Sequence, residues 1–597
     1  MSPAPSRFLL LVVPVLVMTG LGTAATAAVL RVPSPWLIVP LAVLLLVSFK
    51  QLTLTAFVSL LGIVPRRPAP AACDAMLPRE FARTALLVPI YNETPEPIAA
   101  AVAVMAEALR PADDVTIFVL SDTQDPDVIA AEARLFAEFA RSRSGTAIHY
   151  RRRARNIGRK AGNIAEFCNN AGLDYDFAIM LDADSLMTGD AIRGLIAALR
   201  DDLGAGLIQT VPYPIGGRTL FARIQQFAAR LSTPMAVAGQ HLWQGRRGNY
   251  WGHNAIIRLS PFTRHAELPR LPGRAPMGGE ILCHDTIEAA LLLRAGWEVR
   301  LAPDIVGSYE TLPTNLVDHL ARERRWCQGN LQHLRLIGAP RLRPESRIHI
   351  GIGILHYLSM PLGLALSAML LADDWFPAPA NDFTAPANLQ ALLLWFTVCL
   401  LFGPRVVSLG RALLLPGMAR GFGGRVRLLA SALLEQVATM LLAPVMAVSV
   451  TGFVLSTFAG RVVSWDAAAR GDRGVGWREA WQRLRWHTAI GLGLLLLIGG
   501  SRPDVLPWLA PFLLGLIFSV PATMCSGSVW LGELARRCGL FLTEDELMPT
   551  AELAALYRSC ASEQFHYERQ VQPAVKLAPN LRQRAVAGEA GALVQPD

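Results

Sequence analysis

Residues 177–192 read FAIMLDADSLMTGDAI, and this stretch carries the clearest indication of the fold. The apolar run 177–181 is typical of a buried β-strand, yet it leads directly into two carboxylates, Asp182 and Asp184. Strands buried on both faces are typical of parallel sheets, in which ligands bind at the carboxyl ends of the strands. The stretch therefore predicts a strand that delivers a pair of negative charges to a ligand site.

Two more apolar runs in the same part of the chain end in polar residues. TALLVPIYNE at 84–93 ends in Asn92 and Glu93, and TIFVLSD at 116–122 ends in Asp122. Helix-compatible stretches separate these runs, so the pattern predicts an α/β domain built on a mostly parallel sheet. We expect all three polar endings to lie on one edge of that sheet.

The pair of aspartates that follows the first strand has two interpretations. Placed at a strand end, Asp182 and Asp184 offer oxygen ligands to a hard cation such as Mg²⁺, which commonly takes one or two carboxylates together with substrate phosphates. Such a cation neutralises charge that grows on a leaving diphosphate. An acidic turn after a strand explains the same letters equally well, so the pair needs support from other residues.

The segment RRRARNIGRKAGN at 151–163 is strongly basic. It contains Lys160, one of only three lysines in a chain whose positive charge is otherwise arginine, and it ends in Asn163. A solvated helix face is the simple explanation of such a run. We favour a contact of Lys160 and Asn163 with a phosphate or nucleotide.

Two downstream motifs add candidates for chemistry. GGEILCHDTIEAALLLRAGW at 278–297 places Asp285 at the start of a helix, where it is either an N-cap or a general base. RERRWCQGN at 322–330 places Arg325 and Trp326 shortly before an apolar span. The tryptophan is either an interfacial anchor or a stacking surface for a sugar beside a guanidinium that binds diphosphate.

The composition indicates an integral membrane protein. Hydrophobic residues make up 52% of the 597 residues and charged residues 17%, and the mean hydropathy is +0.35. No long apolar run occurs between residues 66 and 347, which therefore form a globular block. The long apolar runs lie outside it, at 8–29, 36–64, 349–371, 388–403, 429–458, 488–500 and 505–521.

Charge places the globular block on the cytoplasmic side. The loop 373–388 contains no Lys or Arg, so the positive-inside rule puts it outside, whereas arginines flank the block 66–347.

Arginines flank the run 429–458 on both sides, which a single crossing does not satisfy, so we expect an interfacial helix, a re-entrant helix or a hairpin. The first apolar run has two interpretations, a signal peptide or an uncleaved anchor, and its position close before a second long span favours the anchor. The expected order is two membrane helices (1–65), the globular block (66–347), two membrane helices (348–404), a cytoplasmic-side segment (405–487), two membrane helices (488–522) and a cytoplasmic tail (523–597).

Other classes of protein fit less well. The net charge of +9 comes from arginines beside apolar spans, where they set topology and meet anionic lipid, so a nucleic-acid partner is not expected. The eight cysteines show no CxxC pair and are interpreted as thiols. A transporter or receptor that merely binds nucleotide is disfavoured, because no Walker-type loop is present and we expect the confident spans to lack a central charged residue of the kind that transport sites need.

The ordered set of motifs resembles the processive family-2 glycosyltransferases of the GT-A fold, the group of the cellulose, chitin and hyaluronan synthases. The set consists of YNE, a strand-end aspartate, KAGN, DAD, an HD-containing segment and RxxRW before a span, over residues 80–330. More narrowly, GHNAIIR at 252–258, CHDTIEAALLLRAGW at 283–297 and RERRWCQGNLQHLRLI at 322–337 resemble the glucosyltransferases H of osmoregulated periplasmic glucan synthesis in Gram-negative bacteria. That likeness extends over nearly the whole chain.

The resemblance implies roles for the candidate residues. Asp122 would contact uridine, Asp182 and Asp184 would hold the diphosphate and Mg²⁺ or Mn²⁺, and Asp285 would be the base. Arg325 would contact the diphosphate and Trp326 would stack on the acceptor sugar. The synthases usually have Glu-Asp where this chain has His284 and Asp285, and Gln where it has Arg322. The stretch 462–471 corresponds in position to a gating loop. The remaining substrate-binding candidates are Asn92, Glu93, Lys160 and Asn163.

The resemblance also implies the reaction. An inverting transfer from UDP-glucose would extend a β-1,2-linked glucan, which would pass through the inner membrane into the periplasm. Another polymer, such as a β-1,4 or β-1,3 glucan, or a lipid-linked acceptor is the alternative, because the donor motifs would be the same. The expected partners are UDP-glucose, the glucan acceptor, membrane lipid and a periplasmic protein that modifies the glucan.

Overall fold

The computed structural model describes residues 6–29, 35–63, 82–141, 145–372, 387–463 and 471–568. A seven-stranded sheet with the order β3-β2-β1-β4-β8-β6-β9 lies at the centre of the globular block. All neighbouring strands pair in parallel except the two pairs that include β8. The expected mostly parallel α/β sheet is confirmed. The strands are β1 (Thr84–Ile90), β2 (Val115–Ser121), β3 (Ile148–Arg152), β4 (Phe177–Met180), β6 (Ala205–Gln209), β8 (Ala255–Arg258) and β9 (Glu298–Leu301).

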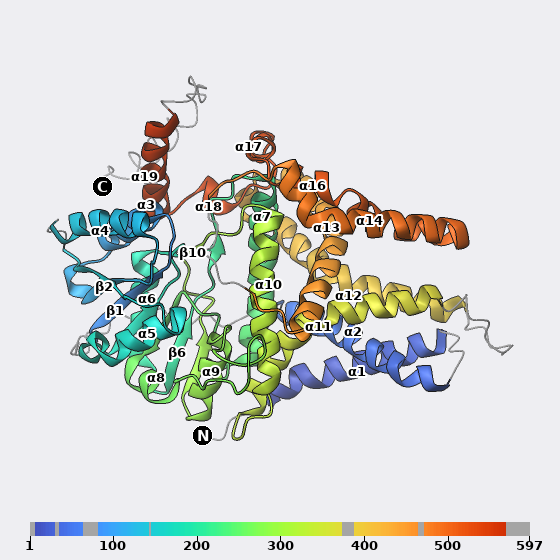
Figure 1. The fold of residues 1–597 in the computed structure, drawn as a ribbon, viewed down its shortest axis with the longest axis horizontal. Helices are drawn as coiled ribbons and strands as arrows, with labels where there is room; N and C mark the ends of the chain where they lie inside the picture. The colour runs from blue at the N-terminus through green and yellow to red at the C-terminus, as the bar shows by residue number, and fades with distance from the viewer. Residues whose placement is uncertain are drawn as a thin grey trace, which may run out of the picture.

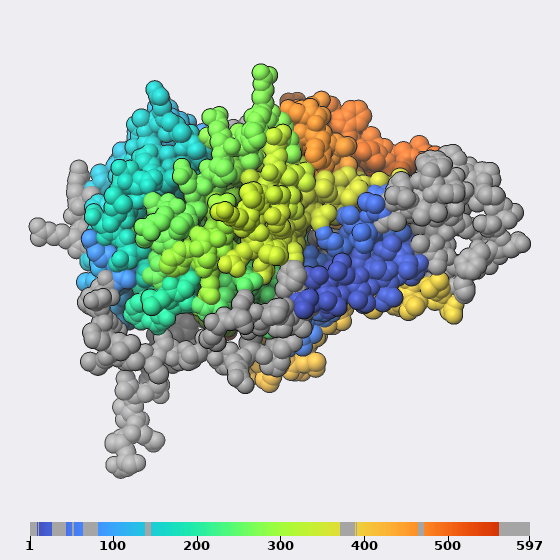
Figure 2. Space-filling view, turned by 90° about the horizontal axis from the view of Figure 1, so that it is seen from below, coloured from blue at the N-terminus to red at the C-terminus, as the bar shows by residue number. Residues whose placement is uncertain are grey.

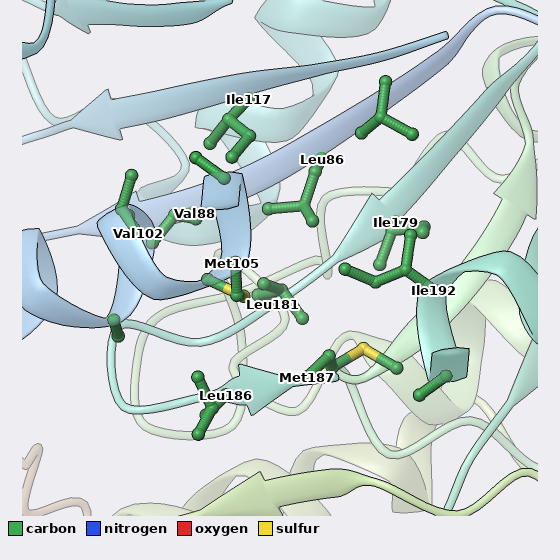
Figure 3. Packing of buried hydrophobic residues seen from close by; sticks show 14 of the residues in the cluster. Leu86, Val88, Val102, Met105, Ile117, Ile179, Leu181, Leu186, Met187 and Ile192 are labelled. Atoms are coloured by element: carbon green, nitrogen blue, oxygen red, sulfur yellow. The ribbon is translucent and has the colours of Figure 1, made fainter. Parts of the chain in front are cut away.

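The opening stretch is apolar because β4 is buried on both faces. All four of its residues are buried, and successive side chains of a strand point to opposite faces. Ile179 lies in one hydrophobic cluster and Met180 in a second cluster on the other face. Figure 3 shows the first cluster, in which Ile179 faces Leu86 of β1, with Met105 of α3 (Pro95–Ala108) nearby. A strand covered on both sides needs an unbroken apolar run.

The register of the parallel strands brings their polar endings together. Ile90 of β1 lies beside Ser121 of β2, and Met180 of β4 lies beside Leu87 of β1. The residues that follow these strands therefore share one edge, as expected. The antiparallel strand β8 begins at this edge, because Ala255 pairs with Met180. The residues just before β8 are thus added to the same edge, and the sequence did not indicate this.

Helices cover both faces of the sheet. On one face α3 packs with α6 (Gly189–Asp201), and on the other α5 (Arg159–Asn169) packs with α8 and α9. A second, three-stranded sheet in the order β5-β10-β7 lies beside the main one. The remaining elements of the block are β5 (Leu186–Met187), β7 (Tyr213–Pro214), β10 (Ser308–Glu310), α4 (Pro126–Arg141), α7 (Leu220–Gln244), α8 (Leu259–His265), α9 (Asp285–Arg294) and α10 (Leu316–Gln332).

Apolar helices extend from one side of the block. Figure 1 shows α1, α2, α12 and α14 extending to the right, away from the sheet, with α10 between them and the strands. Figure 2, from below, shows the same division, with blue, yellow and orange helices to the right of the teal and green block. Among the described residues, five helices are long and apolar enough to cross a membrane, or six when α15 and α16, bent by 65°, count as one span. The protein is therefore an integral membrane protein. The five are α2 (Pro35–Leu61), α11 (Pro344–Ala372), α12 (Ala387–Leu414), α13 (Arg425–Phe458) and α14 (Trp477–Ser501), and the bent pair is α15 (Leu506–Ile517) with α16 (Ser519–Ser526). The apolar stretch within α1 (Ser6–Val29) is shorter.

Two expectations about these helices need correction. The run 429–458 lies in α13, a single continuous helix of 34 residues, so it does not form a hairpin. The helix α12 continues past residue 403, and its candidate span Ala391–Leu414 contains Arg405. The candidate span Val43–Leu61 likewise contains Lys50 near its middle, so the expectation that no span carries a central charged residue is wrong. A sequence window ends an apolar run at the first arginine, whereas a helix continues through an arginine that has a buried partner.

Glycines bring the globular block close to the membrane helices where α7 crosses α2. A Cβ atom at Gly239 of α7 would lie 1.6 Å from the carbonyl oxygen of Val58 in α2, and one at Gly62 would lie 1.8 Å from that of Met235. Only residues without a Cβ allow two backbones to approach this closely. The block and the first two helices are thus in direct contact.

The segment after α16 folds back onto the block. Leu553 of α19 (Ala551–Glu568) is fully buried in the cluster that covers β1 and β4. Arg223 of α7 pairs with Glu546 of α18 (Glu544–Leu547) at 2.7 Å, and the Glu552 carboxylate accepts a hydrogen bond from the Gly189 N–H at 3.0 Å. The globular block therefore includes residues that the sequence-based division left in a tail. The helix α17 (Val529–Arg537) connects the two parts.

Candidate active site

A cavity of about 1190 Å³ opens at the edge of the sheet where the polar strand endings meet. Its wall also includes residues of α7, α10 and α13. The structure brings all of the predicted site residues into this wall except Asn92 and Asn163. Those in the wall are Glu93, Asp122, Lys160, Asp182, Asp184, His284, Asp285, Arg322, Arg325 and Trp326.

Lys160 joins two sides of the cavity. It is the second residue of α5, and its ammonium group contacts the Asp182 carboxylate directly. The same ammonium donates a hydrogen bond of 2.8 Å to the carbonyl oxygen of Gly252, just before β8. The basic segment is thus more than a solvated helix face, because this lysine points into the cavity. A partly buried ammonium beside a carboxylate suits a site that binds a charged diphosphate.

Asp184 lies beside three residues that the sequence analysis missed. The Thr311 hydroxyl donates to the Asp184 carboxylate at 3.1 Å, and the His253 Nε2 atom lies 3.6 Å from the Glu310 carboxylate. Burial, together with the charge of Asp184, raises the pKa of Glu310 to about 7, although His253 opposes the shift. His253 precedes β8 and the other two residues lie at the end of β10 and just beyond it. The polar residues that end and follow β10 were the signal that would have identified Glu310 and Thr311, whereas only the antiparallel direction of β8 brings His253 to this edge.

Asp182 and Asp184 fit a hard divalent cation. Both are carboxylates at one edge of the cavity, and oxygen is the donor that such cations prefer. In the described ranges no three His, Cys, Asp or Glu side chains cluster to form a protein-only metal site. A cation here would take further oxygens from the substrate, as Mg²⁺ commonly does with phosphates.

Asp285 lies at the start of α9 but does not cap it. The N-cap residue is His284, whose side chain makes no capping hydrogen bond and whose Nδ1 atom lies 3.0 Å from the Glu288 carboxylate. Burial and the nearby Glu288 carboxylate raise the pKa of Asp285 above its ordinary range, with His284 opposing them. Burial alone would lower the pKa of His284, but Glu288 raises it overall. A partly buried carboxylate with a raised pKa in a cavity wall is suited to accept a proton.

Gly252 connects the two acidic parts of the site. A Cβ atom at this position would lie 3.5 Å from Oδ2 of Asp285, while the carbonyl oxygen of Gly252 accepts from Lys160, which contacts Asp182. Its φ of +93° is a conformation that L side chains rarely adopt. The backbone at Gly252 thus holds Lys160 on one side and passes Asp285 on the other.

The RxxRW motif forms part of one face of α10. Arg322, Arg325 and Trp326 are three and four residues apart, a spacing that places helical side chains side by side. The Arg322 guanidinium lies 4.5 Å from the centre of the Trp326 ring. The indole lines the cavity and is 43% exposed, so it is accessible to a ligand there. This position favours the sugar-stacking reading over the interfacial anchor.

Three predicted residues have structural contacts that explain their identity. The Asn92 side-chain oxygen accepts from the N–H groups of Gln124 and Asp125, at 2.8 and 3.1 Å. Asn163 is fully buried, where its amide donates to the Leu120 carbonyl at 3.0 Å. Both hold the loop and strand around β2 rather than line the cavity. Asp122 lines the cavity, and its two carboxylate oxygens also accept hydrogen bonds from Nε and Nη2 of Arg153, at 2.6 and 2.7 Å. The sequence alone did not identify this partner.

Comparison with known proteins agrees with this fold. Residues 85–265 match the model of glycosyl transferase family 2, and residues 177–406 match glycosyl transferase family group 2. The match contains β1, β2, β4 and the aspartates that follow them. The globular block is therefore a GT-A glycosyltransferase domain, and the protein is a family-2 glycosyltransferase.

Similar proteins of known name assign the chain to one family within the family-2 glycosyltransferases. Glucans biosynthesis glucosyltransferase H of Shewanella sp. (strain W3-18-1) is 39% identical over 540 residues, which are 88% of this chain and 74% of that protein. The protein of the same name from Shewanella oneidensis is 40% identical over 82% of this chain and 69% of its own length. The chain belongs to the glucans biosynthesis glucosyltransferase H family. It is a glucosyltransferase of glucan synthesis, with a nucleotide-sugar donor and a glucan acceptor.

Proposed function

We propose that the protein transfers glucose from UDP-glucose to a growing β-1,2-linked glucan, with inversion at the anomeric carbon. The observation that carries this proposal is one continuous cavity in which Asp182 and Asp184, the partly buried Asp285 and the Trp326 ring share a wall. Transfer from a donor diphosphate to an acceptor sugar needs a diphosphate site, a base and a surface for the sugar next to one another. The family assignment supports a glucan as the product.

The donor would bind at the edge of the sheet. Asp182 and Asp184 would hold Mg²⁺ or Mn²⁺, which when bound supplies positive charge to the diphosphate. Lys160 and Arg325 would contact the diphosphate oxygens, and Glu93 and Asp122 would lie toward the nucleoside. Charge-assisted hydrogen bonds from these cations would stabilise the UDP anion as it leaves. Asn92 and Asn163 would act indirectly by holding the loops behind this site.

The acceptor would bind between α9 and α10. Its terminal sugar would stack on Trp326, and its hydroxyl group would face Asp285. Asp285 would take the hydroxyl proton as the oxygen bonds to the anomeric carbon and the bond to UDP breaks. Attack opposite the leaving group converts the α-linked donor into a β-linked product. Arg322 would hold the tryptophan ring, and His284, paired with Glu288, would keep the start of α9 in place.

The protein would lie in the bacterial inner membrane with its globular block in the cytoplasm, as the distribution of arginines indicates. The donor would then enter from the cytoplasm, and the glucan would leave through the membrane helices into the periplasm. Anionic lipid would contact the flanking arginines. A periplasmic protein that modifies the glucan would act after this step.

A donor panel followed by linkage analysis tests the proposal. Purified protein would receive UDP-glucose, UDP-galactose, UDP-N-acetylglucosamine or GDP-mannose in separate reactions with Mg²⁺ or Mn²⁺. We expect UDP release only with UDP-glucose and a product with β-1,2 linkages. A β-1,4 or β-1,3 glucan, or a lipid-linked product, would contradict the proposed acceptor and linkage and favour a different branch of the same enzymes.

A further inference from the structure

The turn that carries Asp184 is held in place by the elements that follow it. Asp184 is followed by β5 and then by Gly189, the first residue of α6. The strand β5 pairs antiparallel with β10, with Leu186 opposite Tyr309. The Thr311 hydroxyl, just after β10, donates back to the Asp184 carboxylate at 3.1 Å. The position of Asp184 therefore depends on where β5, β10 and the start of α6 lie.

Residues 541–557, called the clamp segment below, pack against these same three elements. The segment contains α18 and the first part of α19, and Figure 1 shows both helices above β10 at the top of the block. Leu553 lies in the same hydrophobic cluster as Leu186 and Tyr309. All residues of the clamp segment are described, and none of them lines the cavity. The segment therefore acts on the site only through the elements that it contacts.

Glu552 of the clamp segment contacts the start of α6 directly. Its carboxylate accepts a hydrogen bond of 3.0 Å from the N–H group of Gly189, a residue from which it is 363 positions distant in the chain. The first N–H groups of a helix have no partner within the helix and carry partial positive charge, so a carboxylate is a favourable acceptor for them. This contact fixes the end of the turn that begins with Asp184.

Acidic residues of α18 contact the other two strands of the small sheet. Arg230 of α7 lies 4.3 Å from the centre of the Tyr213 ring in β7, and it pairs with Glu544 and Asp545, each at 3.2 Å. Tyr213 lies beside Tyr309 of β10. Burial and the nearby Asp545 carboxylate raise the pKa of Tyr309. The clamp segment thus reaches the strand that leads to the hydroxyl partner of Asp184.

We propose that the clamp segment positions the turn that binds the cation, and that Glu552 is a positioning residue for Asp184. Its contact falls on the helix that begins five residues after this aspartate, and α18 contacts the strand that leads to Thr311. Glu552 would keep the Asp184 carboxylate where a divalent cation and the donor diphosphate meet. This inference rests on the proposed function, because the ligand of the turn is the cation of that proposal.

Binding of Mn²⁺ to the purified full-length protein with UDP tests this without turnover, through the electron paramagnetic resonance signal of free Mn²⁺. Glu552→Ala removes the acceptor for the Gly189 N–H group, whereas Glu552→Gln keeps an oxygen that accepts it. We expect Glu552→Ala to raise the Kd for Mn²⁺ at least roughly threefold, because a charge-assisted hydrogen bond is lost, and Glu552→Gln to restore most of the affinity. Glu533→Ala is the matched control, because Glu533 pairs with Arg536 and Arg537 of its own helix α17.

Hydrogen exchange separates positioning of the turn from a general loss of stability. Peptides that cover residues 182–192 should exchange faster in Glu552→Ala than in wild type and Glu552→Gln. Peptides from α5, on the opposite face of the main sheet, should exchange at the wild-type rate in all three proteins. Unchanged Mn²⁺ affinity in Glu552→Ala, or a loss of affinity with faster exchange throughout the block, would overturn the positioning role.

The same experiments distinguish this inference from the proposed function. Wild-type protein that binds Mn²⁺ with UDP but releases no UDP from UDP-glucose would contradict the proposed function alone, and the Mn²⁺ affinity of Glu552→Ala would still decide the positioning role. Absence of Mn²⁺ binding in wild type would overturn the inference together with the cation of the proposed function.

Discussion

Gly252 passes directly beside Asp285, at a backbone φ of +93°, and a Cβ atom added there would lie 3.5 Å from the carboxylate oxygen Oδ2. The carbonyl oxygen of the same glycine accepts a hydrogen bond from Lys160. One backbone position therefore connects the side of the cavity that would bind the diphosphate with the side that carries the proposed base. Its conformation, more than its size, makes glycine suitable there.

Substitution of this glycine tests the connection. Gly252→Ala would strain the backbone by about 1–3 kcal/mol and shift the carbonyl away from Lys160. We expect turnover to fall at least roughly tenfold, because about 1.4 kcal/mol corresponds to a factor of ten. Gly338→Ala is the control, since no atom lies within 4 Å of a Cβ there and its φ is not positive. Equal turnover in the two variants would show that the Gly252 carbonyl does not position the site.

Removal of the proposed base should affect turnover and its pH dependence. Asp285→Asn should bind UDP-glucose as wild type does and reduce turnover by about 10²-fold or more. Burial raises the pKa of Asp285, so in wild type the active, deprotonated form is lost as the pH falls through a value above the ordinary aspartate range. The acidic limb of kcat against pH should disappear in the variant. A limb that persists in Asp285→Asn and disappears in Glu310→Gln would assign it to Glu310.

The metal prediction concerns the second aspartate of the opening stretch. Asp184→Ala should raise the concentration of Mn²⁺ or Mg²⁺ needed for half-maximal UDP release by at least about tenfold, because even outer partners of metal ligands account for 10–100-fold in affinity. Asp174→Ala, at an exposed position outside the cavity wall, should show the wild-type requirement. The measurement is a metal titration after treatment with chelator. An unchanged requirement in Asp184→Ala would exclude the carboxylate as a ligand.

The contact of α19 with the catalytic block predicts a stability effect far from the site in sequence. Leu553 is fully buried, so Leu553→Ala should destabilise the block by about 2–5 kcal/mol. Leu547→Ala in α18, where the side chain is 43% exposed, should have little effect. Thermal unfolding in detergent compares the two. Equal melting temperatures would show that the C-terminal segment does not belong to the folded block.

The sequence predicted the features that depend on local pattern. The run ending in Asp182 had to be a strand buried on both faces, and the parallel register then placed Asp122, Glu93 and Asp184 in one cavity wall. The helix spacing of Arg322, Arg325 and Trp326 likewise follows from their positions in the chain. In each case a short-range pattern was sufficient.

The features that were missed depend on contacts between distant segments. His253 reaches the site only because β8 is antiparallel, and Arg153 is known as the partner of Asp122 only from the fold. Asn163 resembles a ligand-binding residue in sequence, but the fold buries it against β2. Arg405 ended an apolar run in sequence, whereas Glu435 on another helix lets α12 continue through it.

The most direct test of the central claim is the ratio of UDP released to glucose incorporated into polymer by purified wild-type protein with UDP-glucose and Mg²⁺ or Mn²⁺. The cavity that joins Asp182, Asp285 and Trp326 predicts a ratio of about one, since each transfer leaves one UDP and extends the glucan by one sugar. The same ratio should hold at early and late times. UDP release without incorporation of glucose, or binding of UDP-glucose without release, would contradict the account.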